Sequence, residues 1–182
     1  MSTLRVSTLT ARTGTGTITV PSNNKLVGAT AGAFTAPSGI IQMRHTTAMT
    51  TSHLSTSNTT EVSVPLIAGI TPQAANSVIR VEFFSTMGAG SGSALLTLLY
   101  RRINGGAWTV LTPFTNAASR YQYGWSYDTG GWGPRQNIYY DSPNTTGLVE
   151  YVVNYRLYSG TSIAYLVHQY QEYGYTLTEI AQ

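Results

Sequence analysis

Residues 77–102 read SVIRVEFFSTMGAGSGSALLTLLYRR, two β-type runs joined by a glycine-rich segment. The first run alternates apolar side chains with Arg80 and Glu82, and this two-residue period predicts a strand with one buried face. The second run, 95–100, is apolar on both faces, which predicts a central strand covered on both sides. Because the glycines of 87–93 permit the positive φ angles of a reversing chain, we expect the two runs to form a β-hairpin.

Further β-type runs follow along the chain, separated by turn residues such as Asn104–Gly105–Gly106. No stretch shows the periodicity of a helix of three turns. Short strands at this spacing favour an all-β fold, an antiparallel β-sandwich of the jelly-roll type. The other expected strands are 40–50, 61–67, 108–111, 121–127, 148–158, 163–170 and 173–180.

The first 39 residues differ from the rest, because their short β-prone pieces are separated by glycine, proline and other small residues. We predict an extended N-terminal arm, 1–39, followed by a β-sandwich domain, 40–182. The alternative is that residues 1–39 add strands to the main sheet. Unpaired backbone groups along an arm favour strand addition to another chain, so we expect the arm to anchor the protein. The candidate anchoring residues are Leu4, Val6, Leu9, Ile18 and Val20.

The composition limits the classes of protein to consider. The 182 residues suit one domain with a real core, and only 9% of them are charged, which indicates that a partner covers part of the surface. The formal net charge is +3, but the basic residues are scattered, so we expect no nucleic-acid binding. There are no cysteines, which excludes disulfides and thiolate metal sites. No apolar run approaches the roughly 20 residues that span a bilayer and no signal-peptide core is present, so we expect no membrane insertion.

Residue types that carry catalysis are few and scattered. The acidic residues show no spacing that places two carboxylates on one strand face, and no G-x-S-x-G motif occurs. His45, His53 and His168 lie far apart in the sequence without acidic neighbours, which disfavours a metal site. We therefore predict no catalytic residue, no cofactor and no metal. A hydrolase, with two acidic residues brought together by folding, is the weakest alternative.

Residues 120–140 are rich in aromatic side chains and glycine. The alternating rings of 121–127 predict a strand with the rings on one face, and 130–134 predicts a loop around Trp132. Flat rings beside planar guanidinium groups suit stacking on sugars or burial against a protein. The alternative is that the rings of this aromatic patch, 121–140, cover one end of the sandwich or meet their symmetry mates. The candidate contact residues are Arg120, Tyr121, Tyr123, Trp125, Tyr127, Trp132 and Arg135.

Several motifs spread over nearly the full length of the chain carry a family resemblance. They are STLRVSTL at 2–9, GIIQM at 39–43, ITPQAANSVIRVEF at 70–83, DSPNTTGLVEYVVNYR at 141–156 and TLTEIAQ at 176–182. In these motifs the chain resembles small β-rich virion structural proteins that are common in cyanophages and other marine phages. The resemblance implies a tail-fibre-like or capsid-decorating protein, and it carries over no catalytic residues. The aromatic loop 125–132 departs from the shorter, glycine-rich versions of that family.

These expectations describe a non-enzymatic structural protein of a bacteriophage virion. We expect it to lie on the particle surface after assembly in the host cytoplasm, in contact with other virion proteins of the capsid or tail. A homotrimer is the expected oligomer, because tail fibres and head decorations favour threefold sites. The alternative is a receptor-binding module that recognises host-surface glycan through the aromatic patch.

Overall fold

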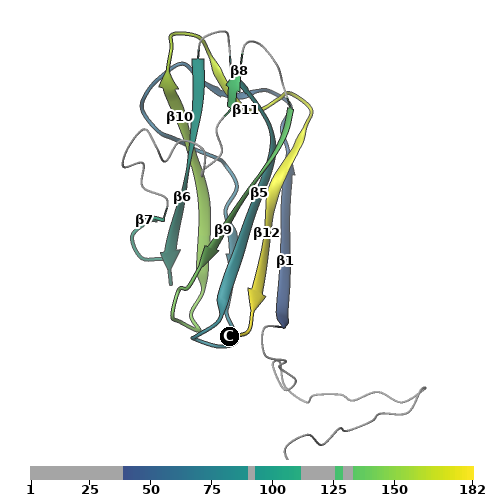
Figure 1. Ribbon diagram of the computed structural model, residues 1–182, viewed down its shortest axis with the longest axis vertical. Coiled ribbons are helices and arrows are strands. Elements are labelled where there is room, and N and C mark those ends of the chain that lie inside the picture. Colours follow the sequence, from purple (N-terminus) through teal and green to yellow (C-terminus); the bar gives the residue numbers. More distant parts are fainter. Residues whose placement is uncertain (1–38, 90–92, 112–125, 129–132) are drawn as a thin grey trace, which may run out of the picture. The chain divides into compact units, whose positions relative to one another are not determined.

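A computed structural model of the chain describes residues 39–89, 93–111, 126–128 and 133–182. These residues all belong to one compact unit, Thr35–Gln182. The regular elements among them are β-strands, which form two antiparallel sheets of six strands each. The predicted all-β antiparallel sandwich is therefore confirmed (Figure 1). The predicted arm lies outside the described residues apart from Gly39, and the domain boundary at residue 39 stays a prediction.

Each sheet combines long strands with short ones. The first sheet contains β1 (Ile40–Met49), β12 (Glu172–Ile180), β5 (Val78–Ala89), β9 (Gly133–Asp141), β11 (Ala164–Val167) and β2 (Leu54–Thr56). The second contains β3 (Val62–Ser63), β4 (Ala68–Ile70), β10 (Val149–Ser159), β6 (Ser93–Ile103), β7 (Thr109–Val110) and β8 (Ser126–Asp128). In Figure 1, β6 and β10 lie at the left, and β12 and β1 lie at the right.

The strand order is that of a jelly roll. In the first sheet β12 lies between β1 and β5, and β9 pairs with the other edge of β5. In the second sheet β10 lies between β6 and the short strands β3 and β4, while β7 and β8 pair with β6. Strands from the start of the sandwich thus pair with strands from its end, as β1 does with β12, and strands nearer the middle pair inside them, as β6 does with β10. This is the pattern of the eight-stranded double-sheet jelly roll, to which β2 and β11 add one more pair.

The expected hairpin of residues 77–102 is wrong. Its two runs do form strands, β5 and β6, but these lie in different sheets: β5 pairs with β12 and β9, and β6 pairs with β10, β7 and β8. The glycine-rich connection therefore leads from one sheet to the other. The expected burial is confirmed, since Ile79, Val81 and Phe83 are buried and β6 is buried on both faces through Leu99. Alternation marks a strand and its buried face, whereas it does not identify the neighbouring strand.

The core lies between the sheets and is built largely from β5, β10 and β12. Phe83 packs against Tyr175 with ring centroids 5.0 Å apart. The backbone N–H of Val153 in β10 donates to the Tyr175 hydroxyl at 2.8 Å, so this ring also joins the two sheets by a hydrogen bond. A buried tyrosine removes about 150–250 Å² from water and needs a partner for its hydroxyl, and here both conditions are met.

A polar seam joins β9 to β6 and β10 at one side of the core. Asp141 is only 5% exposed and accepts hydrogen bonds from Arg101 Nη1 at 2.7 Å and from the Tyr151 hydroxyl at 2.8 Å. Further along β9, the Tyr139 hydroxyl donates to the carbonyl of Leu111 at 3.2 Å. A buried carboxylate is tolerated when its oxygens are paired in this way, so the seam fixes the position of β9 against the second sheet.

Glu179 organises the connection between β4 and β5. Its side chain is fully buried, and Oε1 accepts hydrogen bonds from the backbone N–H groups of Gln73 and Ala74 and from the Ser77 hydroxyl. Its Oε2 accepts a hydrogen bond from Gln42 Nε2 at 2.6 Å. One carboxylate thus satisfies backbone donors that a turn would otherwise leave unpaired, and it ties that turn to β1 and β12.

Gly174 allows β1 to approach β12 closely. It lies opposite Thr47, and a Cβ atom at this position would overlap the carbonyl oxygen of Thr46 and come within 2.9 Å of the Thr47 Cα. Both obstacles are backbone atoms of the neighbouring strand, so they cannot move without shifting β1. Gly69 in β4 differs, because a Cβ there would make only ordinary contacts of 3.4 Å or more.

We predict that Gly174→Ala lowers the free energy of unfolding by about 1–3 kcal/mol, the usual cost of overpacking. Gly69→Ala is the matched strand-glycine control and should change the stability by less than about 1 kcal/mol. Urea unfolding followed by circular dichroism measures both. Equal losses of stability in the two variants would show that the close approach of β1 to Gly174 is not the cause of the loss.

Burial raises the pKa of the core tyrosines Tyr151, Tyr155, Tyr173 and Tyr175 above the ordinary value. A raised folded-state pKa stabilises the protein fully below the unfolded value of about 10, and this contribution is lost as the pH rises through the folded value. We therefore predict alkaline unfolding that begins above about pH 10.

The measurement is tyrosinate absorbance together with circular dichroism during a titration to high pH. Tyr155→Phe removes one of the buried ionisable hydroxyl groups, so it should shift alkaline unfolding to higher pH. Ionisation of every tyrosine without loss of the dichroism signal would contradict the prediction.

Candidate functional site

The predicted contact residues fall mostly outside the described part of the chain. This holds for the arm residues Leu4, Val6, Leu9, Ile18 and Val20, and for Arg120, Tyr121, Tyr123, Trp125 and Trp132 of the aromatic patch. Tyr127 lies in β8, opposite Ala94 of β6, where the structure describes the backbone. Arg135 lies in β9 with an exposed side chain. The role of these residues stays a prediction.

The described residues reveal another surface, the outer face of the first sheet. It is the side of β1, β12, β5 and β9 that points away from the core. Its edge strands carry large apolar side chains that are exposed: Met43 by 64%, Met49 by 72%, Ile138 by 45% and Tyr140 by 60%. Two exposed apolar side chains thus lie along each edge strand of this face, Met43 and Met49 on β1 and Ile138 and Tyr140 on β9.

An aromatic stack lies across the middle of the outer face. The ring of His45 in β1 is parallel to that of Phe84 in β5, with centroids 5.7 Å apart and an interplanar angle of 7°. His45 Nδ1 is also 3.0 Å from the hydroxyl of Thr176 on the intervening strand β12. Gly174 lies opposite Phe84, so the two rings cover the strand where it lacks a side chain.

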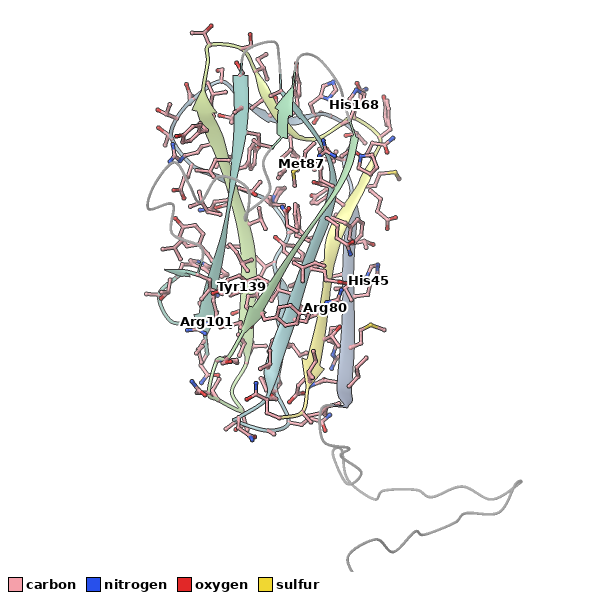
Figure 2. All side chains as sticks on the ribbon, in the orientation of Figure 1. His45, Arg80, Met87, Arg101, Tyr139 and His168 are labelled. Carbon is pink, nitrogen blue, oxygen red and sulfur yellow. The ribbon has the colours of Figure 1, made fainter. Side chains whose placement is uncertain are left out.

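An ion pair occupies the centre of the same face. Arg80 and Glu82 on β5 contact each other through Nη2 and Oε1, and Glu82 is only 8% exposed. Arg80 Nε is buried and has no hydrogen-bond partner in the part of the chain that the structure describes. Figure 2 labels Arg80 and His45, which come from neighbouring parts of this sheet. The outer face thus has a polar centre and an apolar border.

A second surface lies on the other sheet, around Trp108. The guanidinium carbon of Arg102 is 4.6 Å from the centre of the Trp108 ring, and Arg102 donates two hydrogen bonds to Glu150 at 2.8 and 2.9 Å. The hydrogen bond from Arg102 lowers the pKa of Glu150 below its ordinary value. Beside them is a shallow cavity of about 270 Å³, lined by residues 63–67, Trp108 and Val152. This volume is below that of most small-molecule sites.

Sequence reasoning placed Trp108 only in a strand, because a single tryptophan after a turn has no periodic signal. Sequence distance also suggested that His53 and His168 lie far apart, and the structure corrects this. The rings of His53 and His168 meet edge to face with centroids 4.6 Å apart, and Tyr165 packs against His53 at 5.2 Å. The turn before β12 brings His168 back to the segment after β1, which sequence distance does not show.

Polar groups that resemble reactive ones have structural partners. Glu61 accepts a hydrogen bond from the Tyr100 hydroxyl at 2.6 Å, and burial together with this bond raises the pKa of Tyr100 to about 12. Asp141, Glu150 and Glu179 are held as described above. Within the described ranges, no group of three or more histidine, aspartate or glutamate side chains is arranged to hold a metal ion. No helix there is long and apolar enough to cross a membrane.

Comparison with known proteins identifies no family. No protein-family model matches the chain, and no curated protein matches it. Solved structures with a similar arrangement include the infectious bursal disease virus Gx strain, at 12% identity and TM-score 0.41, covering 77% of this chain and 32% of that chain. The VP2 subviral particle of the same virus matches at 12% identity and TM-score 0.40, covering 78% and 38%. The Gt strain matches at 13% identity and TM-score 0.34, covering 76% and 38%. The chain thus spans 32–38% of the length of these structures, and similarity at this level carries no information about function.

Proposed function

We propose that this chain is a non-enzymatic structural protein of a bacteriophage virion, exposed on the particle and held there by its N-terminal arm. The observation that carries the proposal is the outer face of the first sheet. Met43, Met49, Ile138 and Tyr140 are exposed on it in a chain in which only 9% of residues are charged. Exposed apolar surface of this kind indicates contact with other protein.

The fold and the sequence resemblance support the same proposal. Double-sheet jelly rolls serve viral capsid and lectin domains, although a fold by itself does not determine a function. The sequence motifs resemble virion proteins of cyanophages and marine phages. The acidic groups with described partners pair with arginine, tyrosine or backbone donors, so they are engaged in structure. This arrangement favours assembly over catalysis.

In this proposal the arm, residues 1–39, anchors the protein to the capsid or tail, and the sandwich, residues 40–182, faces outward. The protein is tail-fibre-like or decorates and cements the capsid. Its partners are other virion proteins and further copies of itself, with a homotrimer as the expected oligomer. It binds no nucleic acid and inserts into no membrane, and assembly takes place in the host cytoplasm. A high copy number per particle would favour the head, and a low one the tail.

We predict that deleting residues 2–38 abolishes incorporation into particles while the sandwich still folds. The arm would supply the backbone groups and apolar side chains that pair with the particle. Quantitative mass spectrometry of purified phage, grown with the variant in place of the parent, measures incorporation. Circular dichroism of the purified variant checks the fold.

A matched pair of substitutions tests the same point in the full-length chain. Replacing Leu4, Val6 and Leu9 with serine should reduce incorporation at least about tenfold, because each buried apolar side chain contributes about 1.5–3 kcal/mol. Replacing the neighbouring Thr3, Thr8 and Thr10 with alanine should leave it unchanged. Normal incorporation of the deletion variant would show that the arm is not the anchor.

The second candidate function is recognition of host-surface glycan by the aromatic patch, residues 121–140. The observation that favours it is exposure at the described end of the patch, where Arg135 is exposed and Tyr140 is 60% exposed. Tyr140 and Arg135 lie on opposite faces of β9, so each would contact a sugar separately, the ring by stacking and the guanidinium group by hydrogen bonds.

For this alternative, host polysaccharide should change the tryptophan fluorescence of the protein. The chain has three tryptophans, so variants can assign the signal. Replacing Trp125 and Trp132 with phenylalanine should remove the change, and the control Trp108→Phe should retain it. An unchanged spectrum at saturating polysaccharide would exclude the patch as the binding site.

A further inference from the structure

The strand β1 is a long edge of the first sheet. In the part of the chain that the structure describes, it pairs with β12 on one side and with no strand on the other. From Gln42 to Met49 its register with β12 is regular, after a bulge between Ile40 and Gln42. Unpaired N–H and C=O groups along such an edge form a template for another strand.

The structure shows which backbone groups of β1 point toward the free edge. Just beyond the strand, the N–H and C=O of Thr50 both bond to the segment before β12. The carbonyl of Thr46 also points toward β12, where it lies against Gly174. Because these directions alternate along an antiparallel strand, the odd-numbered residues 43–49 present their N–H and C=O groups to the free edge.

Other edges in the described ranges are shorter or blunted. The strands β2, β3 and β7 contain three residues or fewer. The opposite long edge, β9, carries Pro134 and Arg135, residue types that hinder strand addition. In contrast, β1 reads IIQMRHTTAM, with no proline and one formally charged residue, Arg44. Of these edges, β1 is the one suited to accept another strand.

We propose that β1 pairs antiparallel with β1 of a second copy of this chain, with Thr46 on the twofold axis. In this register Met43 lies beside Met49 of the other copy, and His45 lies beside Thr47. The methionines are 64% and 72% exposed in the single chain, and the contact covers them with each other. A twofold contact requires a self-complementary surface, and β1 meets that condition at its centre.

Neighbouring registers are less favourable. A shift that changes odd–odd pairing to odd–even pairing would bring groups that face the free edge opposite groups that face β12. An axis at His45 or Thr47 keeps odd–odd pairing, but it no longer places Met43 beside Met49 and so leaves these exposed side chains without each other. A twofold axis at Arg44 would place two arginines directly opposite each other, which is destabilising. The axis at Thr46 instead places Arg44 opposite Ala48, and it pairs residues 43–49 of the regular stretch with the same residues of the other copy.

The test uses the full chain, which contains no cysteine, so one introduced thiol has a single possible partner. Thr46→Cys places this thiol on the proposed axis. Opposed Cα atoms in a non-hydrogen-bonded pair lie about 4.5 Å apart, within disulfide range. The matched control is Thr47→Cys, a more exposed position at which the Cα atoms of two copies would lie about 8 Å apart.

After mild oxidation, Thr46→Cys should give a disulfide-linked dimer on a non-reducing gel, at least about tenfold more than Thr47→Cys. Adding Thr47→Pro to Thr46→Cys should remove the cross-link. The N–H of residue 47 points to the free edge, so this proline costs no bond to β12. Thermal melts of the reduced variants check that each one folds.

Three outcomes would overturn the proposal: no cross-link at residue 46, equal cross-linking at residues 46 and 47, or a cross-link that survives Thr47→Pro. The first is expected if residues 1–38 cover the edge of β1 instead of a second copy. A twofold contact cannot lie within one threefold trimer, so next to the expected homotrimer it would join copies that belong to two different trimers. The experiment needs no particle and reports the β1 contact whichever other contacts assemble the copies. Its failure is therefore distinct from failure of the virion proposal, which the arm deletion tests.

Discussion

The structure depends on the insertion of β12 between β1 and β5. The last strand of the chain completes the first sheet by pairing with the first strand of the sandwich on one side and with β5 on the other. Gly174 allows the close approach to β1, Tyr175 reaches the second sheet, and Glu179 holds the turn before β5. Because these contacts join distant segments, the sheet is complete only when nearly the whole chain has folded.

This arrangement also determines which surfaces are available to partners. With β12 inside the sheet, β1 is an edge among the strands that the structure describes, and the side chains of Met43 and Met49 remain exposed. The carboxylate of Asp141 joins β9 to the second sheet, and that of Glu179 holds the turn before β5, so both are engaged within the fold. What the described surface offers to another molecule is therefore an open strand and apolar side chains, which suit assembly.

The local features of the fold were predictable. Alternation in 148–158 and 173–180 predicted β10 and β12, and the Asn104–Gly105 turn has the positive φ angles that its residue types favour, 51° and 70°. The pairing of strands was not predictable in the same way. The segment 77–102 has the pattern of a hairpin, yet β5 and β6 lie in different sheets, and His53 meets His168 across more than a hundred residues.

The candidate surfaces show the same division between local features, which the sequence predicts, and contacts between distant segments, which it does not. By itself, the sequence determined the long strands other than β9, the buried faces of β5 and β6, the low charge and the lack of cysteine, because side-chain alternation and composition are local properties of a chain. The strand β9 was not predicted, because its first residues, Gly133 and Pro134, belong to a segment with the pattern of a loop. Only the tertiary structure decided that β1 is an edge among the described strands, that Trp108 lies beneath Arg102, and that the face of β1 with both methionines is exposed. The reason is physical: a strand's neighbours depend on packing and loop closure between distant segments, and neither leaves a period in the sequence.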